Sequence, residues 1–339
     1  MFKKIASFVL AAGLAITSLT GALPVQAQAT YPSELTGLPV STALQSQRPV
    51  AVMVDNDIRS YPHYGVADAD IVYEQVNSMA NNRITRLMCL YKDWGAAAKL
   101  GNIRSTRPTN ILTAIEYNAA LVHDGGPYYI NNYLKSTGIA DLDNRYVPYS
   151  RVNNGKAVEF TEYALTGDIA KSFTLRGISP AYTVNPGSHF TFNPANTDLA
   201  AKYPAAVIPA NLVNLAGNFP NTASQLVYNA ATGTYDYYTF GKPSVDADTN
   251  KQVSFQNVIL QDVATYQYDA NGYLIYNVIG AGVGFYCTNG KCTPISWAKG
   301  SETGKTIYYD VNGAPLSINP GKTYIGLIPQ DSAAQTIIQ

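Results

Sequence analysis

The sequence predicts an α+β protein, in which an N-terminal α/β domain is followed by a mostly antiparallel β domain. In the first half, short apolar strands alternate with segments of helical periodicity, which is typical of α/β layers. In the second half, aromatic and β-branched runs are separated by Asn-Gly pairs at 271–272, 289–290 and 312–313, which are strong signals for β-hairpins. A length of 339 residues fits two domains.

The expected division of the chain follows from these changes in residue pattern along the sequence. It comprises a signal peptide at 1–29, a leader segment at 30–48, the N-terminal α/β domain at 49–190, a connection at 191–224, the C-terminal β domain at 225–330 and a tail at 331–339.

The first 29 residues have the three regions of a secretory signal. Lys3 and Lys4 precede an uncharged stretch that runs to Leu23, and Pro24 is followed by small residues suited to cleavage. A retained membrane anchor is the alternative, although several Gly, Ser and Thr residues dilute the apolar stretch. No cysteine lies near the cleavage site, so no lipobox is present. We therefore expect a secreted or cell-wall-associated protein with no transmembrane segment after cleavage.

The N-terminal domain is expected to contain four buried strands and three helices. The apolar run 50–54 is typical of a strand buried on both faces. Pro108 suits the first turn of a helix, which we expect to continue to about Asn118. The other predicted strands lie at 71–74, 85–91 and 119–123, and the other predicted helices near 128–135 and 166–173.

The C-terminal domain is expected to consist of short strands joined by tight turns. Residues 191–224 contain four prolines and few regular signals, so they are expected to be irregular. The predicted strands are 226–228, 235–240, 258–260, 273–279, 284–286, 306–309 and 323–328.

Composition and motif content exclude several classes of function. Lys plus Arg and Asp plus Glu are both 23, and charged residues make up only 14%, so no nucleic-acid partner is expected from bulk electrostatics. Three cysteines cannot supply a four-cysteine zinc site, and the three histidines lack local ligand spacing. The sequence has no nucleophile elbow or zinc-protease motif. We predict neither a cofactor nor a metal.

The cysteines predict one disulfide bond. Cys287 and Cys292 flank a turn centred on Asn289 and Gly290, and a two-residue turn places the two cysteines opposite each other. Export of the chain would allow the bond to form, although two free thiols remain the alternative. Cys89 lies in an apolar strand, so a buried, inert thiol is expected there.

The densest polar set lies in the N-terminal domain. Arg104, Ser105 and Arg107 immediately precede the helix predicted at Pro108, where guanidinium groups and a helix start favour an anion. Strand ends and helix starts meet along one edge of an α/β domain, so further polar residues are expected beside them. Glu74 and His123 are the catalytic acid/base candidates, and the additional ligand-binding candidates are Arg86, Asp124 and Asn56. In the alternative, Glu74 pairs with an arginine and His123 caps a loop.

Seven motifs carry a resemblance to a known family, at 48–56, 67–74, 84–87, 103–108, 122–126, 257–261 and 316–323. Through them the sequence resembles the YerB-like proteins, an extracytoplasmic bacterial family of unknown function with two conjoined domains (domain of unknown function 3048). The resemblance covers about residues 45–330 and implies Gram-positive-type bacteria, where many members are lipoproteins. Asp55-Asn56-Asp57 stands where members often have Asn-Asn-His, and Asp124 where they often have Ala.

Three hypotheses of function follow. The first is an extracytoplasmic protein that binds an anionic or glycan cell-envelope ligand through an arginine-rich cleft in the N-terminal domain. The second is a hydrolase or transferase on an envelope polymer, with Glu74 or His123 as acid/base. The third is a scaffold that binds an envelope protein through its tyrosine-rich hairpins. The lack of an activated nucleophile favours the first hypothesis over the second.

Overall fold

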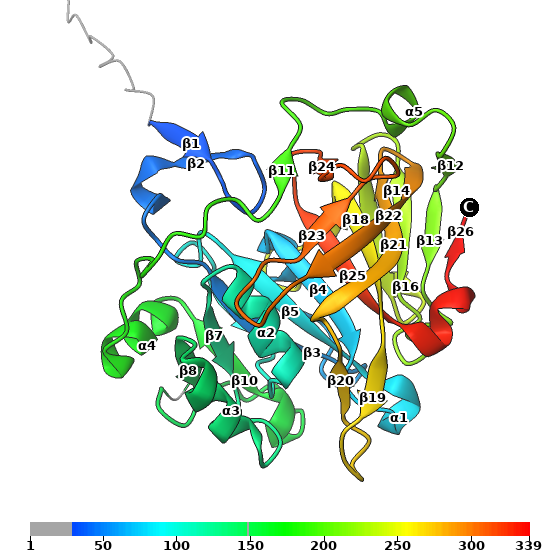
Figure 1. The fold of residues 1–339 in the computed structure, drawn as a ribbon. Helices are drawn as coiled ribbons and strands as arrows, with labels where there is room; N and C mark the ends of the chain where they lie inside the picture. Colours follow the sequence, from blue (N-terminus) through cyan, green and yellow to red (C-terminus); the bar gives the residue numbers. More distant parts are fainter. Residues whose placement is uncertain (1–28, 148) are drawn as a thin grey trace, which may run out of the picture.

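The protein has a mainly β fold, which we describe from a computed structural model for residues 29–147 and 149–339 (Figure 1). The signal peptide predicted at 1–29 therefore lies almost wholly outside the described residues. Within those residues, no helix combines the length and the hydrophobicity needed to cross a membrane.

A large mixed sheet forms the centre of the molecule and contains eleven strands within the described part of the chain. A short strand, β23 (Ile307–Tyr309), pairs with β22 beside the main path. Along that path the order is β12 (Ile208–Pro209), β22 (Lys291–Lys299), β21 (Gly280–Thr288), β18 (Asn257–Val263), β25 (Thr323–Pro329), β4 (Ile71–Val76), β5 (Thr85–Tyr91), β3 (Val50–Asn56), β7 (Ala120–His123) and β8 (Asp141–Asp143).

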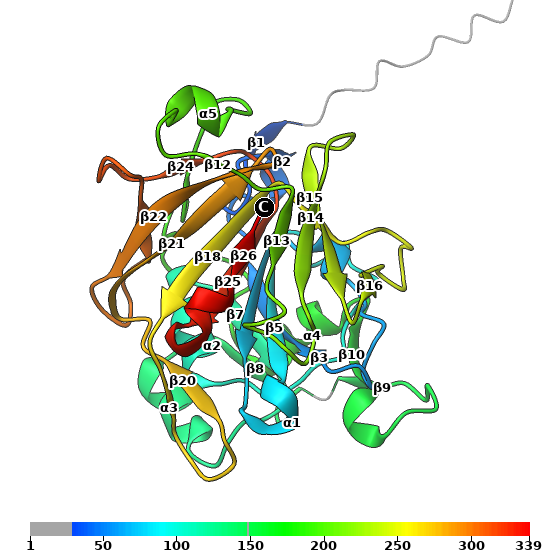
Figure 2. The same cartoon turned by 90° about the vertical axis from the view of Figure 1, so that its right-hand side faces the viewer.

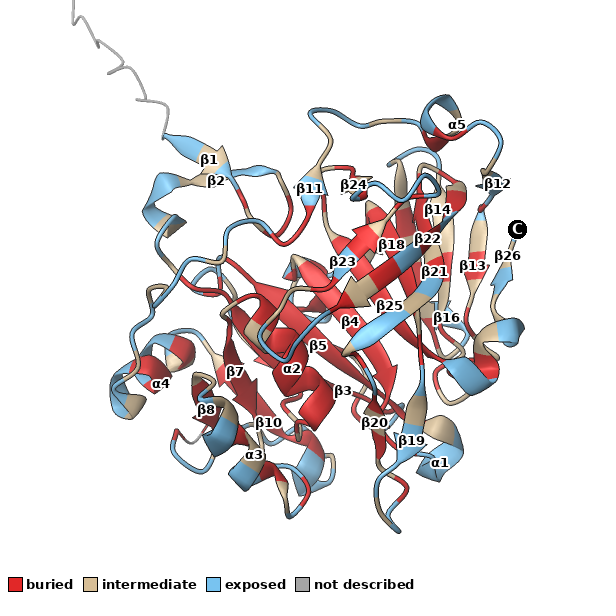
Figure 3. Ribbon diagram, in the orientation of Figure 1, coloured by how far each residue is buried: buried red, intermediate tan, exposed pale blue. Residues whose placement is uncertain are grey.

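The two halves of the chain meet inside this sheet. Strand β25, from the end of the chain, lies between β18 and β4 and is parallel to both. All residues of β25 and β4 are buried, and Figure 3 shows these strands in red at the centre of the molecule. Parallel strands buried on both faces need continuous apolar side chains, which explains the uninterrupted run in β25. Nearby, β18, β21 and β22 pair in the antiparallel manner predicted for this half.

The strands and helices predicted for the N-terminal half lie close to their predicted positions, and the half contains further short strands. The runs at 50–54, 71–74 and 85–91 form β3, β4 and β5. Helix α2 (Pro108–Glu116) begins at the proline, as expected, and is almost entirely buried. It connects to β7, which pairs in parallel with β3. The two other helices of this half with eight or more residues are α3 (Ile130–Thr137) and α4 (Asp168–Arg176); the remaining strands of this half are β6 (Lys99–Gly101), β9 (Ser150–Arg151) and β10 (Glu162–Leu165).

A second sheet packs beside the first on the C-terminal side (Figure 2). The segment predicted as a tail is not free of structure, because η4 (Gln330–Gln335) and β26 (Ile337–Ile338) lie in it and β26 pairs with β13. The leader contains a small hairpin, β1 (Thr30–Pro32) with β2 (Pro39–Ser41). The second sheet comprises β16 (Lys242–Pro243), β15 (Thr234–Thr239), β14 (Gln225–Asn229), β13 (Leu212–Asn214) and β26, with β17 (Ser254–Phe255) paired to β15.

The disulfide predicted at the tip of the β21–β22 hairpin is present. Cys287 and Cys292 are bonded and face each other across the hairpin. Asn289 and Gly290 both have positive φ, at 52° and 70°, as a type I′ turn requires. Cys89 is a free, buried thiol whose pKa burial raises to about 12, so its predicted inertness has a physical basis.

Candidate functional site

An arginine-rich cleft opens where β3 and β5 end and α2 begins. The segment after β6 brings Arg104 and Ser105 to the end of β3, through the hydrogen bond from the Arg104 N–H to the Met53 carbonyl. The cleft has a volume of about 360 Å³. Four predicted binding residues line it together: Arg86, Arg104, Ser105 and Arg107.

Asp55 sets the position of two of these arginines. Its carboxylate is 1% exposed and lies 3.0 Å from Arg104 Nε and 3.8 Å from Arg86 Nη2. Arg104 also contacts Glu159, through the backbone carbonyl at 2.9 Å and the carboxylate at 3.1 Å. Burial lowers the pKa of Arg86 to about 10, so this guanidinium is still charged at neutral pH. Asp55 therefore offsets part of the positive charge that it holds in place.

Arg107 differs from its neighbours because it has no carboxylate partner among the described residues. Its side chain is buried, and its Nη1 donates to the Thr106 carbonyl at 2.8 Å. The guanidinium lies over the Tyr273 ring, 4.1 Å from the centroid, in cation–π geometry. Its Nε has no hydrogen-bond partner in the described structure. A buried donor without a partner is costly, so Arg107 is the group in the cleft best prepared to receive an anion.

The charge balance of the cleft leaves room for one anionic group. Arg59 and Asp57 form a separate pair at 2.6 Å; burial raises the pKa of Asp57, but the hydrogen bonds from Arg59 outweigh this effect and lower it overall. The lining contains four arginines against three carboxylates, those of Asp55, Asp57 and Glu159. One positive charge is therefore in excess, and Arg107 carries it.

The structure places Glu74 away from this cleft. Glu74 is fully buried, and its carboxylate accepts hydrogen bonds from both halves of the chain. Burial raises its pKa, against the effect of these donors. Asn56, another predicted binding residue, is one of the donors and is likewise buried. The donors are Asn56, Thr85, Thr222, Ser224, Tyr237 and Tyr324, at 2.7–3.3 Å.

His123 and Asp124 also lie outside the cleft lining. The His123 ring is buried, with Nδ1 2.8 Å from the Gly125 carbonyl and Nε2 3.0 Å from Asp141. Asp124 pairs with Arg151 at 3.2 Å. The backbone of the 124–125 loop bonds to Arg104 and Thr106, so the loop supports the cleft without supplying side chains to it.

Among the described residues, one group of side chains has the spacing of metal ligands. His123, Asp141 and Asp143 place ligand atoms within 4.8 Å of one another. Arg145 already pairs with Asp143 at 2.9 Å, and both ring nitrogens of His123 have neighbours. His123 lies 18 positions before Asp141 in the sequence. The local spacing of possible ligands therefore does not indicate this group.

Several cleft residues are missed by reasoning from the sequence. Asp55 carried a signal, because it follows a buried apolar strand as Glu74 does. Glu159, Phe160 and Tyr273 reach the cleft only through tertiary packing. Tyr273 comes from the C-terminal half, so no local pattern could have placed it beside Arg107.

Comparison with known proteins agrees with this architecture. Residues 35–179 match the family model described as "Protein of unknown function (DUF3048) N-terminal domain", and 215–325 match that of the corresponding C-terminal domain. The chain is 25% identical over 306 residues to "Putative lipoprotein YerB" of Bacillus subtilis strain 168, covering 88% of this chain and 87% of the relative. The crystal structure of YerB protein from Bacillus subtilis superposes with a TM-score of 0.75 at 21% identity, covering 89% of this chain and 98% of that one. The chain therefore belongs to the YerB-like family of proteins with DUF3048 N- and C-terminal domains.

Proposed function

We propose that this protein is an extracytoplasmic binding protein that holds an anionic group of a cell-envelope polymer in the arginine cleft. The observation that carries the proposal is Arg107, a buried guanidinium with an unpartnered Nε and no carboxylate partner in the described structure. A carboxylate or phosphate oxygen would supply the missing acceptor.

The envelope location rests on two observations. The N-terminal residues have the pattern of a secretory signal, and the Bacillus subtilis relative bears the name "Putative lipoprotein YerB". A polymer, or a protein of the envelope, that carries repeated negative charges would then be the natural partner.

The enzymatic alternative has weaker support. Glu74 and His123 were its acid/base candidates, yet both are buried and neither lines the cleft. A general acid or base must come within hydrogen-bond reach of its substrate. The side chains of Glu74 and His123 instead form hydrogen bonds with other groups of the protein. The scaffold alternative is favoured by exposed tyrosines of one hairpin, Tyr266 and Tyr268, which lie outside the arginine cleft.

Co-sedimentation tests the proposal. Purified Bacillus subtilis cell walls would be mixed with the protein before and after acid extraction of their phosphodiester polymers. Soluble poly(glycerol phosphate) and polygalacturonate would then compete, to distinguish a phosphate ligand from a carboxylate ligand. We expect binding that one of these polyanions displaces. Binding that neither polymer reduces, or no binding to the walls, would contradict the proposal.

A further inference from the structure

A second, larger pocket lies beside the cleft and has a different chemistry. It has a volume of about 560 Å³ and is formed between α2, α3 and the hairpin of β19 (Thr265–Gln267) and β20 (Leu274–Tyr276). The two sites share neighbouring elements, because Arg107 lines the cleft and the next residue, Pro108, lines the pocket. None of the residues lining the pocket is Asp, Glu, Lys, Arg or His. Its occupant is therefore expected to be uncharged where it touches the protein.

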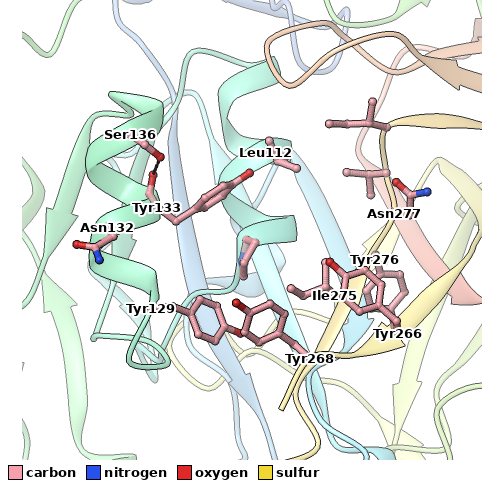
Figure 4. A pocket seen from close by; sticks show the side chains of 13 residues that line it. Leu112, Tyr129, Asn132, Tyr133, Ser136, Tyr266, Tyr268, Ile275, Tyr276 and Asn277 are labelled. Carbon is pink, nitrogen blue, oxygen red and sulfur yellow. Dashed lines mark hydrogen bonds between the residues drawn. The ribbon is translucent and has the colours of Figure 1, made fainter.

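Tyrosines dominate the walls of this pocket. Figure 4 shows Tyr133 on the α3 side and Tyr266 on the hairpin side, with Tyr129 and Tyr268 close together below them. The rings of Tyr129 and Tyr268 are 4.3 Å apart between centroids. Tyr266 is 53% exposed and Tyr268 is 45% exposed. Large aromatic surfaces left open to solvent beside a pocket indicate a binding surface.

The tyrosine hydroxyls remain neutral in this setting. Burial raises the pKa of both Tyr129 and Tyr133 to about 12. Each ring therefore offers an apolar face together with a hydroxyl that can donate or accept a hydrogen bond. This combination suits a ligand with apolar C–H faces and a rim of hydroxyl groups, which describes a pyranose ring.

Amide and aliphatic groups complete the lining. Asn132 on α3 and Asn277 after β20 are exposed, and their side-chain amides make no hydrogen bond within the described structure. Leu112 on α2 and Ile275 on β20 supply aliphatic surface to the same pocket. A free amide next to aliphatic surface matches an acetamido substituent, whose amide needs hydrogen bonds and whose methyl group needs apolar contact. A fatty acyl chain would leave these amides and hydroxyls without partners.

From this chemistry we infer that the tyrosine pocket binds neutral, N-acetylated pyranose rings of an oligosaccharide. Tyr266 and Tyr133 would stack on the sugar faces, and Asn277 would pair with an acetamido group. The assignment goes beyond the proposed function, because it concerns a different site and does not require Arg107.

Saturation-transfer NMR and calorimetry with chitotetraose, the β-1,4-linked tetramer of N-acetylglucosamine, test the inference on the full mature chain. Cellotetraose, which lacks the acetamido groups, is the matched ligand. The variants are Tyr266→Ala and Tyr268→Ala in the pocket, with Tyr146→Ala as the control, since Tyr146 is 49% exposed and lies outside the pocket. Melting temperatures establish that each variant is folded.

We expect chitotetraose to bind, cellotetraose to bind at least tenfold more weakly, and each pocket variant to lose at least tenfold in affinity for chitotetraose. Tyr146→Ala and Arg107→Ala should leave chitotetraose binding unchanged. Absence of binding by the wild type, or pocket variants that bind as the wild type does, would overturn the assignment. Equal affinity for cellotetraose would overturn its N-acetyl component. Because Arg107→Ala alone should lose polyanion binding, failure at one site is distinguishable from failure at the other.

Discussion

The guanidinium of Arg107 lies 4.1 Å from the centroid of the Tyr273 ring. Arg107 is the N-cap residue of helix α2 in the N-terminal half, and Tyr273 directly precedes β20 in the C-terminal half. The contact therefore joins the two halves at the cleft. The ring face holds the cation without neutralising it, so the charge is still available to a ligand.

Removal of the Tyr273 ring should weaken anion binding by loosening Arg107. A cation–π contact contributes about 0.5–2 kcal/mol, so Tyr273→Ala is expected to lower polyanion affinity roughly three- to thirtyfold. Tyr273→Phe keeps the ring and should bind nearly as well as the wild type. Titration of both variants with the same polymer checks this, and equal losses in the two would point to the hydroxyl instead of the ring.

Glu74 should matter for stability and not for binding. Its carboxylate satisfies donors from both halves, among them Tyr237 at 2.9 Å and Tyr324 at 2.7 Å. Glu74→Ala leaves buried hydroxyls short of an acceptor and is expected to lower the free energy of unfolding by about 2–4 kcal/mol.

Urea denaturation measures this effect. Glu302→Ala, which removes an exposed carboxylate, is the control and should change the free energy of unfolding by less than about 0.5 kcal/mol. If Glu74→Gln stayed as stable as the wild type and yet lost polyanion binding, Glu74 would contribute to the arginine cleft. That result would contradict the purely structural role that its burial indicates.

The disulfide should stabilise the hairpin modestly. Cys287 and Cys292 are only five positions apart, and a short loop gains little from closure, about 2 kcal/mol by chain entropy. The double variant Cys287→Ser, Cys292→Ser is expected to unfold at a correspondingly lower urea concentration while keeping polyanion binding. Alkylation under mild denaturation without reductant should label only Cys89 in the wild type. Labelling of all three cysteines would show that the bond is absent.

Glu162 should make stability fall as the pH rises. Burial, and then the neighbouring carboxylate of Asp124, raise the pKa of Glu162 from the ordinary value of 4.5 to about 8. Between these values the folded state binds a proton that the unfolded state releases. The stabilising contribution is therefore complete below about pH 4.5 and is lost as the pH rises through 8.

Glu162→Gln removes this titration, and Asp248→Asn, at an exposed acid elsewhere, serves as the control. Urea denaturation at pH 5, 6.5 and 8 should show the wild type losing stability relative to Glu162→Gln at each step. A difference that stays constant with pH would mean that Arg151, 2.6 Å from Glu162, keeps the carboxylate ionised throughout.

Local patterns in the sequence predict where strands and helices lie better than they predict which strands pair. The apolar run at 85–91 is β5 to the residue, and Pro108 marks the start of α2, because burial and proline geometry act locally. The hairpin tip at Cys287 and Cys292 is predicted, but the rest of strand β22 is not among the predicted strands. The parallel pairing of β25 with β4 joins residues about 250 positions apart, and no local signal encodes such a pairing.

The same distinction applies to the site. Arg104, Ser105 and Arg107 are neighbours in sequence, so their shared cleft follows from one helix start. Glu74 ends an apolar run, as residues of ligand-binding loops often do. Tertiary packing nevertheless surrounds it with hydroxyl groups from the other half of the chain. Strand position alone cannot distinguish a carboxylate that faces solvent from one that the second sheet covers.

The most direct test of the central claim is the affinity of Arg107→Ala for a soluble polyanion, measured by calorimetry together with the melting temperature. Arg145→Ala is the matched control, because it also removes one positive charge but lies outside the cleft. A shielded arginine–anion contact contributes roughly 1.5–3 kcal/mol, so we predict a ten- to hundredfold loss of affinity for Arg107→Ala and little change for Arg145→Ala. A lower melting temperature with unchanged polyanion affinity in Arg107→Ala would contradict the account.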